Sequence, residues 1–312
     1  MTIENLFAVF IISIIFIMRV IVGSNYTHIY MLVPFLLASQ LLRQSNHSFL
    51  KYNFWIKFSL LVIIFTLGRI GVLPSTQVIK SNGSTILSMG FVHTNSIGIL
   101  GFSILLDYIL LTCQEHISSK NIISISLFTL IIYQICLSRN FLLLSLGIIF
   151  GLLSYKYLKK DYLKKTILQT ATVFIFTLGT FLWIKYDPNN IVWRVINTIL
   201  SNRPMLSKYY IDIYGIKWLP QNFERLFLDR FWDKIEYYLD NSFVQILVSQ
   251  GLIIFILLFC FVLFVQQTKR FDFITTLSII FVYICLVIEA IPFNIFLLTP
   301  LYYQYFHIKE QS

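Results

Sequence analysis

The feature that most constrains this chain is a series of continuous apolar runs that recur from one terminus to the other. Each run has roughly the 17 to 25 residues that a helix needs to cross the hydrocarbon core of a bilayer. Inside hydrocarbon the backbone must satisfy its own hydrogen bonds, so only helices or a closed barrel can span it. Because the runs are continuous rather than alternating, they predict helices. We therefore expect an all-α fold, a polytopic transmembrane helix bundle.

Composition supports this prediction. The 312 residues are 57% hydrophobic and only 12% charged, whereas soluble domains are about a quarter charged. No water-soluble fold of this size could cover that much apolar surface. The first run, from about Leu6 to Val22, lacks a basic leading segment and a clear cleavage site, so we interpret it as a span rather than a signal peptide.

We predict about ten spans, with nine to eleven as the range because the second and the last are short. Their approximate bounds are 5–22, 28–42, 54–73, 89–112, 121–137, 140–157, 166–184, 242–265, 272–289 and 291–306. The predicted division is an N-terminal bundle of about seven spans in 1–184, a large loop in 185–241, and C-terminal spans with a short tail in 242–312.

Basic residues predict the orientation, because they concentrate in cytoplasmic loops. They recur in or beside every second loop, at Arg43, Lys51, Lys57, Lys120, Lys156, Lys159, Lys160, Lys164, Lys165, Lys269, Arg270 and Lys309. This pattern predicts a multi-pass membrane protein with both termini cytoplasmic and 185–241 outside. Orientation in the membrane also accounts for the net charge of +10. The charge therefore gives no reason to expect nucleic acid as a partner.

The 185–241 segment carries eight basic and seven acidic residues and about a dozen aromatic ones. That composition is not typical of a disordered linker, so we expect the segment to pack on the membrane surface. Ser201 or Asn202 is expected to cap a short helix with Pro204 in its first turn and Gly215 at its end. The range 223–239 is interpreted as a second amphipathic helix.

Several polar residues converge on the predicted outer boundary. They are Arg69, His93, Asn95, Arg139, Glu289 and Asn294. Ionisable groups at membrane depth are costly unless they are paired or hydrated, so this grouping predicts a polar cavity that opens outward. Arginine suits phosphate oxygens, and Arg139 and Arg203 are the first candidates for holding a phosphate or pyrophosphate.

Simpler interpretations stay open for the same residues. An arginine at a span end also extends to lipid headgroups, and His93 could be an interfacial histidine. Asp107 lies about 25 Å along its helix from the outer boundary at 1.5 Å per residue, so we interpret it as structural. The sequence has no Asp-x-Asp pair, His-rich cluster or glycine-rich phosphate loop, so neither a metal nor a nucleotide cofactor is expected.

Four short segments resemble motifs of the bacterial polysaccharide polymerase and O-antigen ligase superfamily, the Wzy- and WaaL-type proteins. The segments occur in the family's order between residues 89 and 265. They are Gly90-Phe-Val-His93-Thr-Asn95, Leu137-Ser138-Arg139-Asn140, Ser201-Asn202-Arg203, and Asp240-Asn241-Ser242-Phe243 followed by Gln250-Gly251. Ligases of this family typically have His-Asn where this chain has Asp240-Asn241, and 185–241 contains no histidine. The departure favours a polymerase.

The resemblance implies an enzyme at the outer face of the bacterial cytoplasmic membrane that transfers a glycan from a polyprenyl pyrophosphate carrier to another lipid-linked repeat unit. The product would be capsular polysaccharide, exopolysaccharide or O-antigen, and neither metal nor nucleotide would be needed. A chain-length regulator and a flippase of the same pathway would be partners. Arg139 and Arg203 would stabilise the pyrophosphate. Asp240 would be the base, with Glu289 and His93 as alternatives, while Arg69, Asn95 and Asn241 would contact substrate.

Three other functions stay open: a ligase of the same superfamily, a flippase or transporter of lipid-linked saccharide, and a receptor or structural membrane protein. Transporters commonly contain internal repeats, and the two halves of this sequence show no clear repeat.

Overall fold

The computed structural model describes residues 46–79, 85–91, 94–114, 116–158, 165–222, 226–230, 233–237, 239–268, 271–289, 291, 297 and 299–300. The predicted spans 5–22 and 28–42, most of 291–306, and His93 lie outside the described residues.

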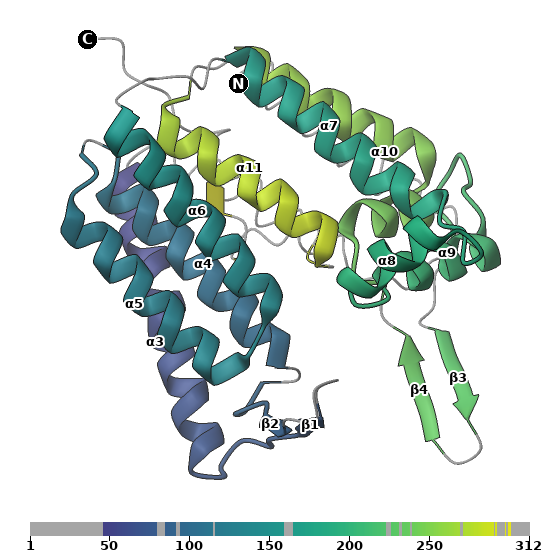
Figure 1. The fold of residues 1–312 in the computed structure, drawn as a ribbon, viewed down its shortest axis with the longest axis horizontal. Helices are drawn as coiled ribbons and strands as arrows, with labels where there is room; N and C mark the ends of the chain where they lie inside the picture. The colour runs from purple at the N-terminus through teal and green to yellow at the C-terminus, as the bar shows by residue number, and fades with distance from the viewer. Residues whose placement is uncertain are drawn as a thin grey trace. The chain divides into compact units, whose positions relative to one another are not determined.

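The described chain is mainly helical (Figure 1). Its helices are α3 (Asn46–Arg69), α4 (Thr94–Thr112), α5 (Ser119–Cys136), α6 (Arg139–Leu158), α7 (Lys165–Ile184), α8 (Ile191–Ile199), α9 (Arg203–Tyr214), α10 (Ser242–Thr268) and α11 (Phe273–Ile288). Its strands form two antiparallel hairpins, β1 (Gln77–Ile79) with β2 (Thr85–Leu87), and β3 (Leu226–Arg230) with β4 (Asp233–Tyr237).

Six of these helices, α3 to α7 and α10, are long and apolar enough to cross a membrane, and α11 is a shorter apolar helix of 16 residues. They correspond to the third to ninth predicted spans, so the helical prediction is confirmed for these residues, which are compatible with a multi-pass membrane protein. The total of ten spans and the orientation stay predictions. The start of the third predicted span is wrong: α3 begins at Asn46 rather than at 54, so Lys51 lies within the helix.

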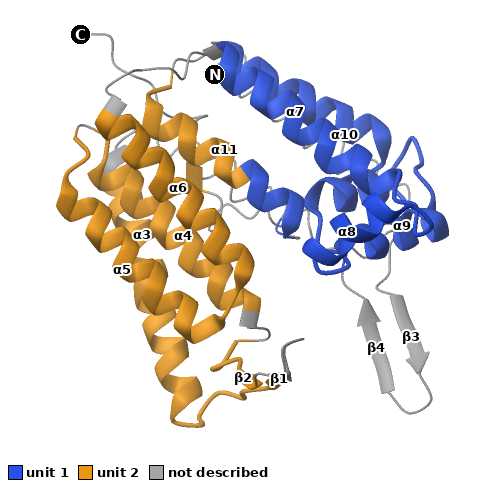
Figure 2. Ribbon diagram, viewed as in Figure 1, with its two compact units in different colours: residues 1–37, 165–270, 283–294 blue, residues 38–164, 271–282, 295–312 orange. Residues whose placement is uncertain are grey.

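The chain divides into two compact units (Figure 2). Unit 2 comprises 38–164, 271–282 and 295–312 and includes α3 to α6. Within it, α4 packs against α3, α5 and α6, and it is the most deeply buried of the candidate spans. Its residues Ile97, Leu105 and Ile109 are almost completely buried. Helix α4 is therefore the core element of unit 2.

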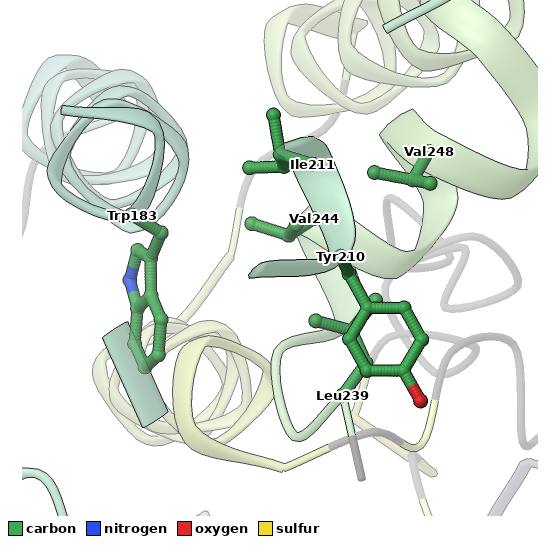
Figure 3. Close-up of a cluster of buried hydrophobic side chains, with 6 residues drawn as sticks. All are labelled: Trp183, Tyr210, Ile211, Leu239, Val244 and Val248. Atoms are coloured by element: carbon green, nitrogen blue, oxygen red, sulfur yellow. The ribbon is translucent and has the colours of Figure 1, made fainter. Parts of the chain in front are cut away.

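Unit 1 comprises 1–37, 165–270 and 283–294. Its buried core brings together residues from α7, α9, the approach to α10, and α10 itself (Figure 3). The residues are Trp183, Tyr210, Ile211, Leu239, Val244 and Val248. Part of the predicted loop, helix α9, is thus packed onto candidate membrane helices rather than tethered loosely beside them.

Helix α10 is interrupted at Gly251, which has φ 83° and ψ 168°. This conformation is essentially restricted to glycine, and a Cβ there would lie 2.7 Å from the Trp218 carbonyl oxygen. The 217–221 segment hydrogen-bonds the backbone groups that the break releases: Leu252 and Ile253 donate to Lys217 and Trp218, while Gln221 donates to Val248 and Ser249. Irregular backbone at membrane depth requires such burial in protein.

The predicted second amphipathic helix in 223–239 is wrong, because the chain forms the β3–β4 hairpin there. The register pairs Leu226 with Tyr237, Leu228 with Ile235 and Arg230 with Asp233. The β1–β2 hairpin and α8 were not predicted either, whereas the predicted helix between Asn202 and Gly215 is confirmed as α9.

Candidate functional site

The start of α9 is fixed by a neighbouring helix rather than by its own cap. Asn202 has a left-handed backbone conformation and its side chain does not cap the helix, contrary to the prediction. Instead, the Oδ1 of Asn197 on α8 accepts a hydrogen bond from the Met205 backbone N–H (3.0 Å), and its amide donates to Asn202 Oδ1 (2.8 Å). Helix α8 therefore caps α9, and Arg203 begins α9 at a defined position.

Arg203 bridges two carboxylates that come from distant parts of the sequence. Its Nε donates to Asp240 Oδ2 at 3.2 Å, and its Nη2 donates to Glu289 Oε1 at 3.3 Å. The Arg203 and Glu289 side chains are 6% and 8% exposed, and that of Asp240 is 31% exposed. We call these three residues the Arg203 cluster. It lies within unit 1 and joins α9, the residue pair before α10, and the end of α11.

Two buried side chains hold the carboxylate-bearing segments in place. Asn241 caps α10 by accepting from the Val244 N–H at 3.0 Å, and its amide donates to the Gly179 carbonyl of α7 at 2.8 Å. Ser242 donates to the Glu289 backbone carbonyl at 2.5 Å and accepts from the Ile291 N–H at 3.0 Å. Asn241, predicted to contact substrate, thus makes structural hydrogen bonds, and substrate contact stays a prediction.

The charge balance of the cluster differs from what the sequence suggested. We expected Arg203 to be available for an anionic ligand, but it already contacts two carboxylates. The cluster thus contains one guanidinium and two carboxyl groups. The guanidinium carries N–H donors beyond the two that make these bonds. Asp240, the most exposed member, is the group that solvent or a ligand can reach.

The other predicted site residues that the structure describes belong to unit 2. Arg139 is the first residue of α6 and is exposed. The preceding residue, Ser138, is buried, and its hydroxyl accepts a hydrogen bond from the Phe141 N–H (3.4 Å). Arg69 is the exposed last residue of α3, and Asn95 is partly buried near the start of α4. A shared cavity for these residues and Arg203 stays a prediction.

A second buried ionic cluster lies within unit 2. The sequence analysis predicted a structural role for Asp107 but did not predict its contact with Lys57. Lys57 Nζ is 2.7 Å from Asp107 Oδ2, and both side chains are fully buried. Asn53 donates to Asp107 at 3.0 Å, and both Asn53 and Lys57 donate to the Thr299 hydroxyl. We had placed Lys57 beside a cytoplasmic loop. An acidic and a basic residue in two consecutive spans was the signal that could have paired them.

The described residues contain no group of three or more His, Cys, Asp or Glu side chains suited to a metal ion. A scan against models of known protein families, a search of curated proteins and a search of solved structures each return no match to this chain.

Proposed function

We propose that this chain is a metal-independent, glycosyltransferase-type polysaccharide polymerase that uses polyprenyl-pyrophosphate-linked oligosaccharide as donor and acceptor. The observation that carries the proposal is the Arg203 cluster, in which a buried guanidinium holds a partly exposed carboxylate at the start of a candidate membrane helix. Arg203 and Asp240 are also the residues that the family resemblance singles out in the predicted outer segment.

The proposed reaction forms one glycosidic bond and breaks another. An acceptor hydroxyl oxygen attacks the anomeric carbon of the donor glycan, and the bond between that carbon and the pyrophosphate oxygen breaks. The leaving polyprenyl pyrophosphate takes the electron pair, and the hydroxyl proton passes to a carboxylate. A base within hydrogen-bond reach of the hydroxyl and a fixed cation near the leaving group are the two requirements.

Asp240 fits the base better than Glu289 does. Its side chain is 31% exposed, whereas that of Glu289 is 8% exposed. Arg203 orients Asp240 through Nε and leaves further N–H donors for a pyrophosphate oxygen. Arg139 remains the second proposed pyrophosphate contact, and Arg69, His93 and Asn95 remain proposed substrate contacts.

Two experiments distinguish this proposal from its alternatives. A ligase would use the same donor but a different acceptor, so a deletion strain would accumulate long lipid-linked polymer rather than single repeat units. A flippase would move the substrate without forming a bond, so purified protein would give no longer product. The flippase and the chain-length regulator of the same pathway are proposed partners.

The test is product length from purified protein and a synthetic lipid-linked repeat unit. Wild-type protein is expected to give polymer, and Asp240→Asn and Arg203→Gln are expected to give almost none. Lys208→Gln is the matched control, because Lys208 lies on the same helix and pairs with Asp212 outside the cluster. Wild-type chain lengths from both cluster variants, or loss of polymer in the control alone, would contradict the proposal.

A further inference from the structure

Helix α8 exposes its apolar side chains and buries a polar one, the reverse of a helix packed on a soluble protein. Its four most exposed apolar residues recur along one face, with exposures of 68% for Ile191, 61% for Val192, 53% for Val195 and 69% for Ile199. At 100° per residue these positions fall within about one third of the helix circumference. The opposite face carries the polar Asn197, which is 7% exposed and caps α9.

Helix α9 and the chain that follows it continue this apolar surface. Met205, Tyr209 and Ile213 are spaced four residues apart and are partly exposed, while Arg203, Ser207 and Tyr210 are directed inward. After the helix, Trp218 is 67% exposed and Leu219 is 45% exposed. Exposed apolar surface of this kind marks an interaction site.

Both helices are too short to cross a bilayer. Helix α8 has nine residues and α9 has twelve, about 14 Å and 18 Å at 1.5 Å per residue, against about 30 Å of hydrocarbon. Yet α8 begins seven residues after the candidate span α7 ends, and α9 packs against both α7 and α10. The two short helices are therefore attached to two candidate spans, α8 through the chain and α9 through packing.

The charges around this surface favour an anionic partner. Outside the buried Arg203, the described residues 185–222 carry four basic side chains, Lys185, Arg194, Lys208 and Lys217, against two acidic ones, Asp187 and Asp212. The difference of four minus two leaves a net charge of +2. An apolar stripe flanked by basic residues is the pattern of a helix that lies in a membrane interface.

We propose that α8 and α9 form an interfacial anchor, with the stripe of Ile191, Val192, Val195 and Ile199 inserted among the lipids of an anionic phospholipid bilayer. The anchor would hold the start of α9, and with it Arg203, at headgroup depth. The inference does not depend on the proposed function, because it rests on the exposure, length and connections of the two helices.

The test uses the full chain reconstituted in vesicles of phosphatidylcholine and phosphatidylglycerol, with its four cysteines replaced by alanine and one new cysteine labelled with a fluorophore. A label at Val195→Cys is expected to lose fluorescence to a lipid-borne nitroxide and to resist aqueous iodide. Val173→Cys, on the exposed side of α7, is the lipid-facing control. Asn189→Cys, in the exposed turn before α8, is the aqueous control.

Two outcomes would overturn the proposal. Strong iodide quenching at Val195, equal to that at Asn189, would place the stripe in water. Resistance to both quenchers would show that protein covers it, whether a second copy or residues 5–42 of this chain.

If the cysteine-free protein does not fold, the native tryptophans give the same answer. Brominated phospholipids are expected to quench wild-type fluorescence more than that of Trp218→Phe, because Trp218 is 67% exposed beside α9. Equal quenching of the two proteins would count against the anchor.

Discussion

The two buried ionic clusters found among the described residues differ in the number of carboxyl groups per cation and in exposure. In unit 2, Lys57 faces Asp107 one to one, and both side chains are fully buried. In unit 1, Arg203 faces two carboxylates, one of which is 31% exposed. A one-to-one pair of fully buried side chains has no surface to offer a ligand, whereas the Arg203 cluster exposes Asp240. The comparison indicates that Lys57 and Asp107 hold helices together and that the Arg203 cluster is the one suited to chemistry.

The largest effect is expected from breaking the closed pair. Asp107→Ala would leave the Lys57 ammonium buried without its counter-charge, and removal of one member of a buried pair costs about 3–5 kcal/mol. The free energy of unfolding, measured by thermal or denaturant unfolding in detergent, should fall by that amount, and little protein should accumulate in the membrane.

Ser103→Ala is the matched control for this change. Ser103 lies one turn before Asp107 on α4 and is equally buried, but its hydroxyl has no hydrogen-bond partner. A loss of stability in Ser103→Ala as large as that in Asp107→Ala would mean that packing of α4, and not the ion pair, sets the cost.

The next largest effect is expected from Arg203→Gln. The change leaves Glu289 buried without its cation, but Asp240 can still be solvated, so the cost should be lower, roughly 2–3 kcal/mol. If polymerisation depends on the cluster, product length should also collapse in the stable fraction of the protein. Arg203→Lys should restore charge and most of the stability but little activity, because a lysine cannot contact both carboxylates with a planar fork.

The sequence could predict features that depend on neighbouring residues, but not contacts between residues far apart in the chain. Runs of apolar residues predicted seven described helices, because a membrane helix needs length and hydrophobicity and little else. Pro204 and Gly215 predicted the bounds of α9, because they act on the local backbone, although Asn202 does not cap the helix as predicted. Residues of the same cluster, such as Arg203 and Glu289, are 86 positions apart, and no local pattern reports such a pairing.

The errors have the same physical origin. The β3–β4 segment was predicted as a helix because a short mixed apolar and charged run fits both periods. Lys57 was assigned to a loop edge because a lysine in hydrocarbon is costly, and its contact with Asp107, a distant residue, offsets that cost. The charge state of the Arg203 site could not be predicted either, since it depends on which carboxylates fold beside the guanidinium.

A smaller effect on stability is expected from Asp240→Asn. Asp240 is partly exposed and its amide counterpart can keep the hydrogen bond from Arg203, so the free energy of unfolding should change by about 1 kcal/mol or less. Activity should nevertheless fall by at least about tenfold, because an amide cannot accept the hydroxyl proton. Glu289→Gln should lower the free energy of unfolding more than Asp240→Asn does and should lower activity less. Equal activity losses with equal stability losses in the two variants would remove the distinction between them.

The smallest effect is expected when both charges of the closed pair are removed together. In Lys57→Met with Asp107→Asn, no unpaired charge remains, and the hydrogen bond from Asn53 to Thr299 (2.7 Å) persists. Neutral replacement of a buried pair is often harmless, so the double variant should lie within about 1 kcal/mol of wild type although Lys57→Met alone should be severely destabilised. A double-mutant cycle of unfolding free energies measures this difference as a coupling energy. Additive losses would show that Lys57 and Asp107 do not act as a pair, and loss of polymer in the stable double variant would show that the closed cluster contributes to function after all.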